Sequence, residues 1–217
     1  MLKSLIIYTV FALLIASIII GVSWNKPAIS PSISPSPTPA LSSATTPIAI
    51  SSVFGEPVSN AKQRITKKPF GIYVSPGHSP INPEKFTGYH TGTDFEIFSG
   101  EENTDIQIFT ICDDPLLEKK TATGYGGVVV QKCSLNNQPI TVIYGHLKLS
   151  SISAIAGQQF KTGDKLAILG APYSAETGGE RKHLHLGIHK GADIVLFGYV
   201  QNQSELSGWF NFIDYFK

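Results

Sequence analysis

The sequence contains little cysteine, almost no net charge and no long amphipathic helix. Two Cys among 217 residues are too few for a disulfide-scaffolded miniprotein or a Cys-rich zinc finger. The 17 basic and 16 acidic residues give a net charge of +1, which lacks the strong positive footprint of a nucleic-acid-binding protein. The 20 Gly and 14 Pro favour many turns and argue against a long helical bundle.

Residues 5–22 form an uncharged apolar run that Lys3 precedes and Trp24 follows. As a helix this run would span about 27 Å, close to the roughly 30 Å hydrocarbon core of a bilayer. A cleaved secretory signal is the alternative, but its apolar core is shorter, about 7–15 residues, and ends in a small-residue cleavage site. The sequence therefore predicts a short segment 1–4 and a single-pass anchor over residues 5–24. We expect the rest of the chain on the extracytoplasmic side of the cell membrane.

Residues 25–65 are predicted to be a Pro/Ser-rich linker and a lead-in to the globular part. Residues 27–50 contain six Pro and six Ser and no charged side chain. Such a segment cannot bury a core and favours extended, polyproline-like conformations. We expect a spacer that holds one globular domain, residues 66–217, at a distance from the membrane.

The globular part is predicted to be all-β. Residues 209–216 are the candidate for a short terminal helix. We expect mainly antiparallel pairing, in a two-sheet sandwich or a partly open barrel with a groove. Five short runs rich in β-branched residues, separated by turn residues, carry this prediction: 106–112, 127–133, 140–146, 165–170 and 183–189.

The sharpest chemical pattern is the alternation of His with apolar residues in residues 183–189 (HLHLGIH). On a strand, His183, His185 and His189 would share one face, and the apolar residues between them would face the core. Imidazoles at i and i+2 stand about 7 Å apart along a strand, near enough to converge on one small site. This pattern indicates a site rather than a His-rich surface, although the spacing does not say which histidines would bind a metal.

Two further elements carry groups that bind metals or move protons. His90 and Asp94 lie four residues apart around Gly92, so an extended segment would project both side chains from one face. Zinc accepts His nitrogen and carboxylate oxygen, and a catalytic site commonly has three protein ligands and one open position. His146 ends an apolar run, in the sequence Tyr144-Gly145-His146-Leu147. Each of these patterns is weak alone.

Taken together and in this order, the three elements resemble the lysostaphin-type (LytM-like) zinc endopeptidases of bacterial cell walls. The resemblance covers most of residues 66–217 and includes the run GYGGVVV at 124–130 and the stretch at 157–170. It implies a zinc-activated water that hydrolyses peptide bonds in peptidoglycan, with one Zn²⁺ per chain. The site residues that it implies are the metal ligands His90, Asp94 and His185 and the non-ligand catalytic histidines His146 and His183.

The sequence also departs from the family's pattern. Gly127 stands where many members have Asn, and Arg181 and Lys182 stand where many have Gly and a small residue or Pro. These two cations could favour an anionic group of the substrate or could point to solvent. The alternative to an enzyme is a catalytically inactive LytM-like module that binds the wall or activates an amidase. A pure binding module is a further alternative, suggested only by the stretch at 157–170.

Five further residues are candidates for other roles. Cys112 and Cys133 lie near the ends of predicted neighbouring strands, and we expect a disulfide rather than two buried thiols, because disulfides persist outside the cytoplasm. His78 is expected in a solvated turn, and His189 at the rim of the site or on the surface. Glu96 lies two residues after Asp94 and would share its face of a strand, so it is the alternative carboxylate ligand should Asp94 not bind the metal.

Overall fold

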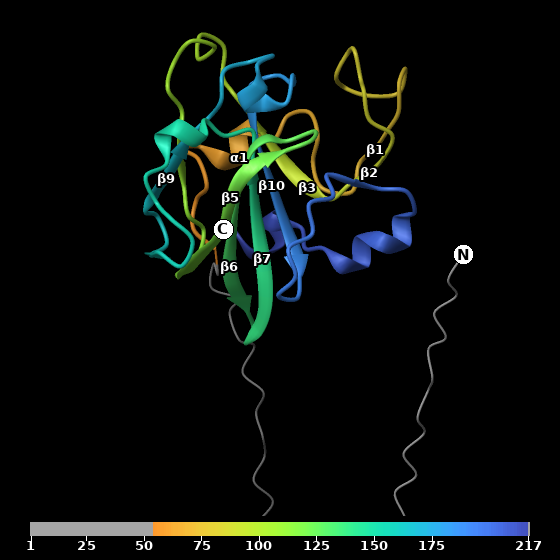
Figure 1. Cartoon of the computed structure of the whole chain (residues 1–217). Coiled ribbons are helices and arrows are strands. Elements are labelled where there is room, and N and C mark those ends of the chain that lie inside the picture. The colour runs from red at the N-terminus through yellow and green to blue at the C-terminus, as the bar shows by residue number, and fades with distance from the viewer. Residues whose placement is uncertain (1–53, 217) are drawn as a thin grey trace, which may run out of the picture. The chain divides into compact units, whose positions relative to one another are not determined.

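The computed structural model describes residues 54–216, which fold as an all-β domain with short helical turns (Figure 1). Its α-helix is the single turn α1 (Ala61–Arg64), and its 3₁₀ turns are Leu149–Ser151, Ala175–Thr177, Gln203–Gly208 and Phe212–Tyr215. The strands are β1 (Tyr73–Val74), β2 (Gly88–His90), β3 (Gly92–Glu96), β4 (Gln107–Phe109), β5 (Asp114–Ala122), β6 (Gly126–Leu135), β7 (Gln138–Gly145), β8 (Gln159–Phe160), β9 (Lys165–Ile168), β10 (His183–Lys190) and β11 (Tyr199–Val200).

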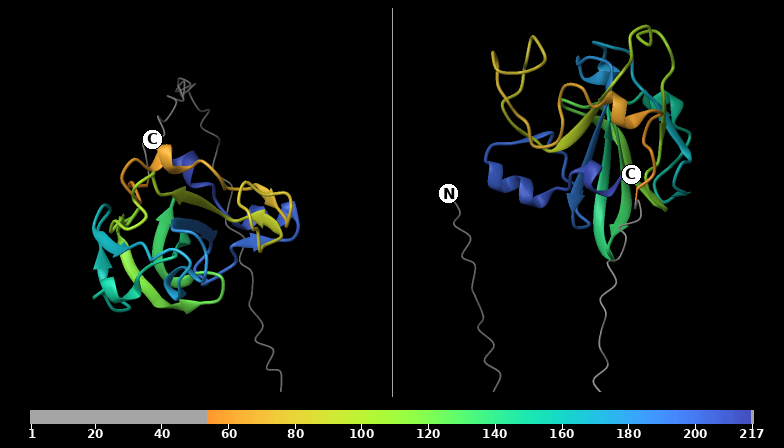
Figure 2. Two further views of the ribbon diagram at one scale, coloured as in Figure 1. Left: turned by 90° about the horizontal axis from the view of Figure 1, so that it is seen from above. Right: turned by 180° about the vertical axis from the view of Figure 1, so that it is seen from behind.

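Strand pairing among these residues is antiparallel throughout and gives three sheets. The main sheet has six strands in the order β3-β10-β7-β6-β5-β8, and two small sheets have the orders β1-β2-β11 and β4-β9. In Figure 1 the long β6–β7 hairpin (green) runs beside β10 (blue), and Figure 2 shows the same strands from above and from behind. The all-β, antiparallel prediction is confirmed, but the strands form three sheets instead of the expected two, because β4 and β9 pair only with each other and the chain changes sheet between β2 and β3.

The core lies against the apolar face of the main sheet. On β10 the three apolar side chains Leu184, Leu186 and Ile188 are at most 1% exposed and belong to this core. The histidines between them face the other side of the sheet, as the alternation of β10 predicts. Burying one face of a strand fixes its register, because a slip of one residue would exchange the two faces. The packing of the core thus decides where His183 and His185 point.

All five strands expected from the sequence are present, as β4, β6, β7, β9 and β10. The expected terminal helix is a 3₁₀ turn, Phe212–Tyr215. Residues 54–65 contribute to the core as well, since Phe54, Val58 and Ala61 are buried in it.

The disulfide prediction is confirmed, because Cys112 and Cys133 are bonded to each other. Both residues are buried, and Cys133 lies within β6. The bond therefore ties the segment just before β5 to the strand with which β5 pairs.

The predicted anchor at 5–24 lies outside the described residues, as does most of the predicted linker at 25–65. Among residues 54–216, no helix combines the length and the hydropathy needed to cross a bilayer.

Candidate metal centre and active site

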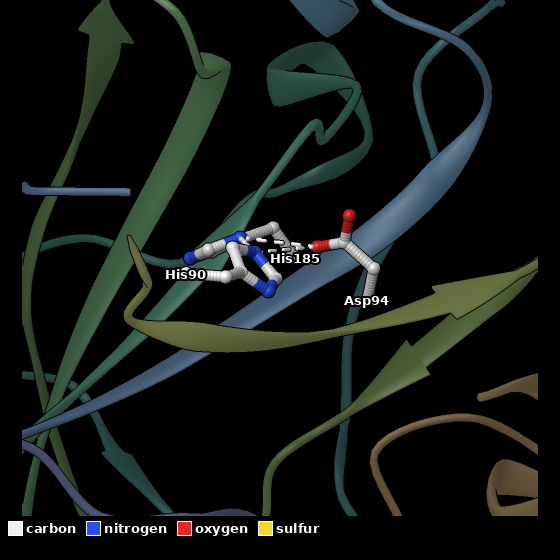
Figure 3. A group of neighbouring side chains, drawn as sticks. All are labelled: His90, Asp94 and His185. Atoms are coloured by element: carbon white, nitrogen blue, oxygen red, sulfur yellow. Dashed lines mark hydrogen bonds and ion pairs between the residues drawn. The ribbon is translucent and has the colours of Figure 1, made fainter. Parts of the chain in front are cut away.

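Three side chains from three strands meet in one buried group: His90 of β2, Asp94 of β3 and His185 of β10 (Figure 3). The Nε2 atom of His90 lies 3.0 Å from Nδ1 of His185 and 3.2 Å from Oδ1 of Asp94. The same Oδ1 atom lies 3.1 Å from Nδ1 of His185. Zinc ligands with bonds of 2.0–2.1 Å stand about 3.3 Å apart at the corners of a tetrahedron. The three atoms therefore have the spacing of three ligands around one ion.

The hydrogen bonds behind the two histidines support the same interpretation. Nδ1 of His90 lies 3.3 Å from the carbonyl oxygen of Pro69, which only accepts, so this nitrogen carries the proton and Nε2 is bare. Nε2 of His185 lies 3.4 Å from the hydroxyl of Tyr125, and in the tautomer that donates to this oxygen Nδ1 is bare as well. Two lone pairs and a carboxylate oxygen then face one another, an arrangement that a cation stabilises.

Burial and neighbouring charges keep these groups in the forms that bind metals. Burial lowers the pKa of His185 to about 4, against the opposing effect of Asp94. Burial alone would raise the pKa of Asp94, but the neighbouring His183 and His90 hold it well below its usual range. At pH 7 His185 is therefore neutral and Asp94 is ionised, as zinc ligation requires.

Gly92 leaves the room that His185 needs. A Cβ atom at this position would lie 2.6 Å from Nε2 of His185 and 2.7 Å from the carbonyl oxygen of Leu186. Contacts that short are repulsive, so a side chain at residue 92 would displace the imidazole. The absence of bulk between His90 and Asp94, noted in the sequence, therefore serves the third member of the group.

His146 and His183 lie next to this group with their rings together, at a centroid distance of 4.3 Å. Nδ1 of His146 donates to the carbonyl oxygen of Thr177 over 3.0 Å, and Nδ1 of His183 donates to that of Arg181 over 2.8 Å. The neutral ring of His146 therefore offers Nε2 as a proton acceptor. Nε2 of His183 lies 3.3 Å from Oδ2 of Asp94. Burial, followed by the charges of His183 and His185, lowers the pKa of His146 well below its ordinary value.

The backbone at His146 explains how its ring turns towards His183. The residue follows the end of β7 and has a φ of +65°, in the left-handed region that non-glycine residues seldom adopt. Its N–H donates to the carbonyl oxygen of Tyr125, and its own carbonyl oxygen accepts from Gly170. These bonds hold an unfavourable conformation in place, which is typical of functional positions.

Four of the five residues border one cleft of about 270 Å³: Asp94, His146, His183 and His185. His90, the fifth, is fully buried and does not line it. Aromatic side chains form much of the wall: Phe86, Tyr125, Phe197 and Tyr199. Lys68 also faces this cleft and is buried, with Nζ 2.6 Å from Glu84 and 3.0 Å from the hydroxyl of Tyr199. The site is thus an open pocket with polar groups at its base and apolar walls.

The structure puts the other weighed histidines outside this cleft. His78 is exposed in a turn, where its backbone bonds with Ser75, as expected. His189 packs against Trp209, with ring centroids 4.9 Å apart, and takes no part in the group.

Arg181 and Lys182 do not point to solvent. Their exposures are 9% and 6%, and Lys182 donates to the carbonyl oxygens of Glu101, Glu102 and Thr104. Arg181 binds Asp94 and Glu96, which the sequence analysis did not foresee. The sequence does indicate that Arg181 could share a face with His183 and His185, because the three residues are spaced two apart. It does not indicate the acidic partners, which lie more than 80 positions away.

The model of peptidase family M23 matches residues 88–196, half of the chain. The chain belongs to peptidase family M23. The matched segment contains all five candidate residues and Arg181, whereas Lys68 and Tyr199 lie outside it. Family M23 implies a peptidase, and its members are generally zinc-dependent. The resemblance to lysostaphin-type peptidases is therefore confirmed at the level of the family.

Solved structures similar to this M23 domain include LytU, with 22% identity and a TM-score of 0.46 over 70% of this chain and 84% of that one. The catalytic domain of the antimicrobial peptidase lysostaphin from Staphylococcus simulans has 18% identity and a TM-score of 0.45, over 71% and 96% of the two chains. Csd3 from Helicobacter pylori has 21% identity and a TM-score of 0.41, over 69% of this chain and 35% of that one. A comparison with curated proteins finds no significant match.

Gly127 is explained by its surroundings in this domain. A Cβ atom at residue 127 would collide with the carbonyl oxygen of Leu147 and would lie 2.9 Å from Cγ of Leu149. The backbone around residue 127 in this chain therefore leaves no room for a side chain.

Proposed function

We propose that this protein is a membrane-anchored zinc endopeptidase that hydrolyses peptide bonds in peptidoglycan. The observation that carries the proposal is the convergence of His90, Asp94 and His185, whose ligand atoms all lie within 4.8 Å of one another. When bound there, a zinc ion would polarise the scissile carbonyl and lower the pKa of a water molecule towards about 7. Membership of family M23 supports the peptidase activity. The zinc ion, the peptidoglycan substrate and the membrane anchor are what we propose beyond it.

The protein's own contribution to the chemistry is proton transfer and substrate positioning. The lowered pKa of His146 keeps its Nε2 atom unprotonated at pH 7, so this atom is available to accept a proton. In its protonated form, with Nδ1 donating to the carbonyl oxygen of Arg181, His183 would donate a hydrogen bond from Nε2 to the oxygen that gains charge during the reaction. Their Nδ1 atoms are both held by backbone carbonyls, which fixes the ring orientations.

The walls of the cleft suit a peptide. Phe86, Tyr125 and Phe197 offer apolar surface on which a peptide chain can lie, beside the polar groups at the base. Burial keeps Tyr125 and Tyr199 protonated, because it raises the pKa of both hydroxyls. Both remain hydrogen-bond donors at neutral pH.

An inactive wall-binding or amidase-activating module is the alternative. Such a protein has no need for a group of three metal-binding atoms flanked by two oriented histidines. The retention of all five residues in one buried arrangement therefore supports the active enzyme.

The proposed anchor and location derive from the sequence. The apolar run at 5–22 and the uncharged Pro/Ser-rich stretch at 27–50 fit a membrane helix and a spacer. Membrane fractionation of the full-length chain, with and without residues 1–24, tests this part separately from the chemistry.

The central experiment incubates full-length protein with purified sacculi of several compositions, with and without chelator. We expect muropeptide fragments that carry new amino termini, measured by mass spectrometry, and their loss on chelation and in the His185→Ala variant. Stoichiometric zinc binding with no fragment from any sacculus would contradict the enzyme and favour the inactive module.

A further inference from the structure

Arg181 joins the proposed zinc ligand Asp94 to a second buried carboxylate, Glu96. Its Nη2 atom lies 2.8 Å from Oδ2 of Asp94, and its Nε atom lies 3.0 and 2.9 Å from the two oxygens of Glu96. Nη2 also contacts Oε1 of Glu96. All three side chains are buried, with Asp94 at 2% exposure and Arg181 at 9%. One guanidinium therefore binds two carboxylates away from bulk water.

This contact fixes the rotation of the Asp94 carboxylate. Oδ1 faces His90 and His185, whereas Oδ2 faces Arg181 and His183. A carboxylate that is free to rotate would present either oxygen, or both, to the two histidines. The planar, rigid fork of an arginine restrains such a rotation better than a point charge does.

The same contact occupies Glu96. Glu96 lies two residues after Asp94 on β3, so both side chains project from the same face of the strand. In the register of β3 and β10, Glu96 is the partner of His183 and Asp94 is the partner of His185. Another cation near Glu96, Lys67, is farther away, at 3.6 Å, and its side chain is 43% exposed. Without Arg181, Glu96 would keep only the more distant and more exposed Lys67 as a partner beside the metal ligands.

We propose that Arg181 is a positioning residue of the zinc site, which presents Oδ1 of Asp94 to the ion while Glu96 holds the guanidinium in place. The inference rests on the proposed zinc site and adds to it a residue that holds the ligand. Partners that orient metal ligands typically contribute about 10–100-fold to metal affinity.

The rival explanation is that Arg181 only neutralises Glu96 and so stabilises the fold. The two explanations differ in what removal of both partners does. A buried ion pair can be replaced by apolar residues without loss of stability, and the net charge near the ion is then unchanged. If Arg181 serves only Glu96, this double replacement restores zinc binding; if Arg181 positions Asp94, it does not.

The experiment measures the zinc Kd of the full-length protein by competition with a chromophoric chelator. The variants are Arg181→Met, Arg181→Lys and the double variant Arg181→Met/Glu96→Leu. The matched control is Lys182→Met, which removes the neighbouring buried cation that binds backbone carbonyls instead of carboxylates. Thermal unfolding of each zinc-free protein reports on the fold independently.

We expect zinc binding to be weaker than in the wild type by about 10–100-fold in Arg181→Met. In the double variant it should remain weaker than in the wild type, by about tenfold or more. Arg181→Lys should fall between wild type and Arg181→Met, because lysine keeps the charge but not the fork. Lys182→Met should keep the wild-type Kd.

Wild-type zinc affinity in the double variant would overturn the inference. Equal or tighter zinc binding in Arg181→Met would overturn it as well, because that is the result expected if the removal of a positive charge near the ion were the only effect. If Arg181→Met does not fold, the lysine and double variants decide. A wild-type protein that binds no zinc would overturn the proposed function itself, whereas unchanged binding across the variants of Arg181 overturns only this inference.

Discussion

His185 of β10 is the direct antiparallel partner of Asp94 of β3, and on its other side it pairs with Gly145 of β7. Two proposed zinc ligands are thus brought together by strand register, and the pairing with β7 brings the following residue, His146, to the same place. Strand pairing therefore assembles most of the site without long loops. Changes that alter packing within these strands should affect zinc binding before they affect the fold.

Gly92→Ala tests this coupling directly. The new methyl group would lie 2.6 Å from the ring of His185, and relief of the overlap has to move the imidazole or the strand. Overpacking of this kind costs about 1–3 kcal/mol, so we expect zinc affinity to fall by about 5–150-fold. Zinc competition titration measures the effect.

The control for this variant is Gly208→Ala. A Cβ atom at residue 208 meets nothing within 4 Å, and no left-handed backbone conformation is involved. Equal zinc affinities for the two alanine variants would show that His185 does not need the space at Gly92.

His146→Asn should separate proton transfer from metal binding. Asparagine tolerates the left-handed backbone at this position, where φ is +65°, better than most residues do. Loss of a general base or acid typically lowers the rate by about 10²–10⁴-fold. We expect such a loss of sacculus hydrolysis, with the zinc affinity almost unchanged. Loss of zinc together with activity would make His146 a ligand instead.

The zinc-free protein should lose stability as the pH falls from about 6.5 towards 4. The unfolded chain protonates His185 near its ordinary pKa of about 6.5, whereas burial lowers the folded-state pKa to about 4. Between these values the unfolded state binds more protons, so the free energy of unfolding decreases with decreasing pH. For His185 alone we expect a loss of about 2 kcal/mol between pH 7 and pH 5.

Urea unfolding of chelator-treated protein at a series of pH values measures this slope. His185→Asn should flatten it, and His78→Asn should not, because His78 is exposed in a turn. A slope that both variants leave unchanged would show that His185 is not the group responsible.

Removal of the disulfide should lower stability without changing the site. The bond between Cys112 and Cys133 spans 21 positions, and closing a loop of this size contributes about 3 kcal/mol in the chain-entropy model. We expect Cys112→Ser/Cys133→Ser to unfold at lower urea concentration by about that free energy, with the zinc Kd unchanged. Reductant should destabilise the wild type and have no effect on the variant; equal midpoints for the two proteins would contradict the prediction.

The sequence predicts the strands whose formation depends on their own apolar pattern and misses those that depend on partners. β6, β7 and β10 are rich in β-branched or alternating apolar residues, and all three were expected. β5 (DPLLEKKTA) is dominated by polar and charged residues and is a strand because β6 and β8 pair with it. Propensity for strands depends strongly on such context.

The site was predicted to a different degree for each residue. Alternation alone placed His183 and His185 on one face, but it could not say which of them lies nearer His90; the resemblance to the family suggested His185. The structure brings Nδ1 of His185 to 3.0 Å from His90, whereas His183 reaches Asp94. Arg181 could not be assigned a partner from the sequence, because the long-range pairing of β3 with β10 creates the contact.

Because the even-numbered positions Leu184, Leu186 and Ile188 anchor β10 in the core while the odd-numbered His183 and His185 face the cleft, the strand divides into a packing set and a chemical set of positions. A mutant library that randomises only the even set would therefore vary how the two histidines are oriented while leaving their identity unchanged. A library confined to the odd set would sample new metal preferences on an unaltered scaffold.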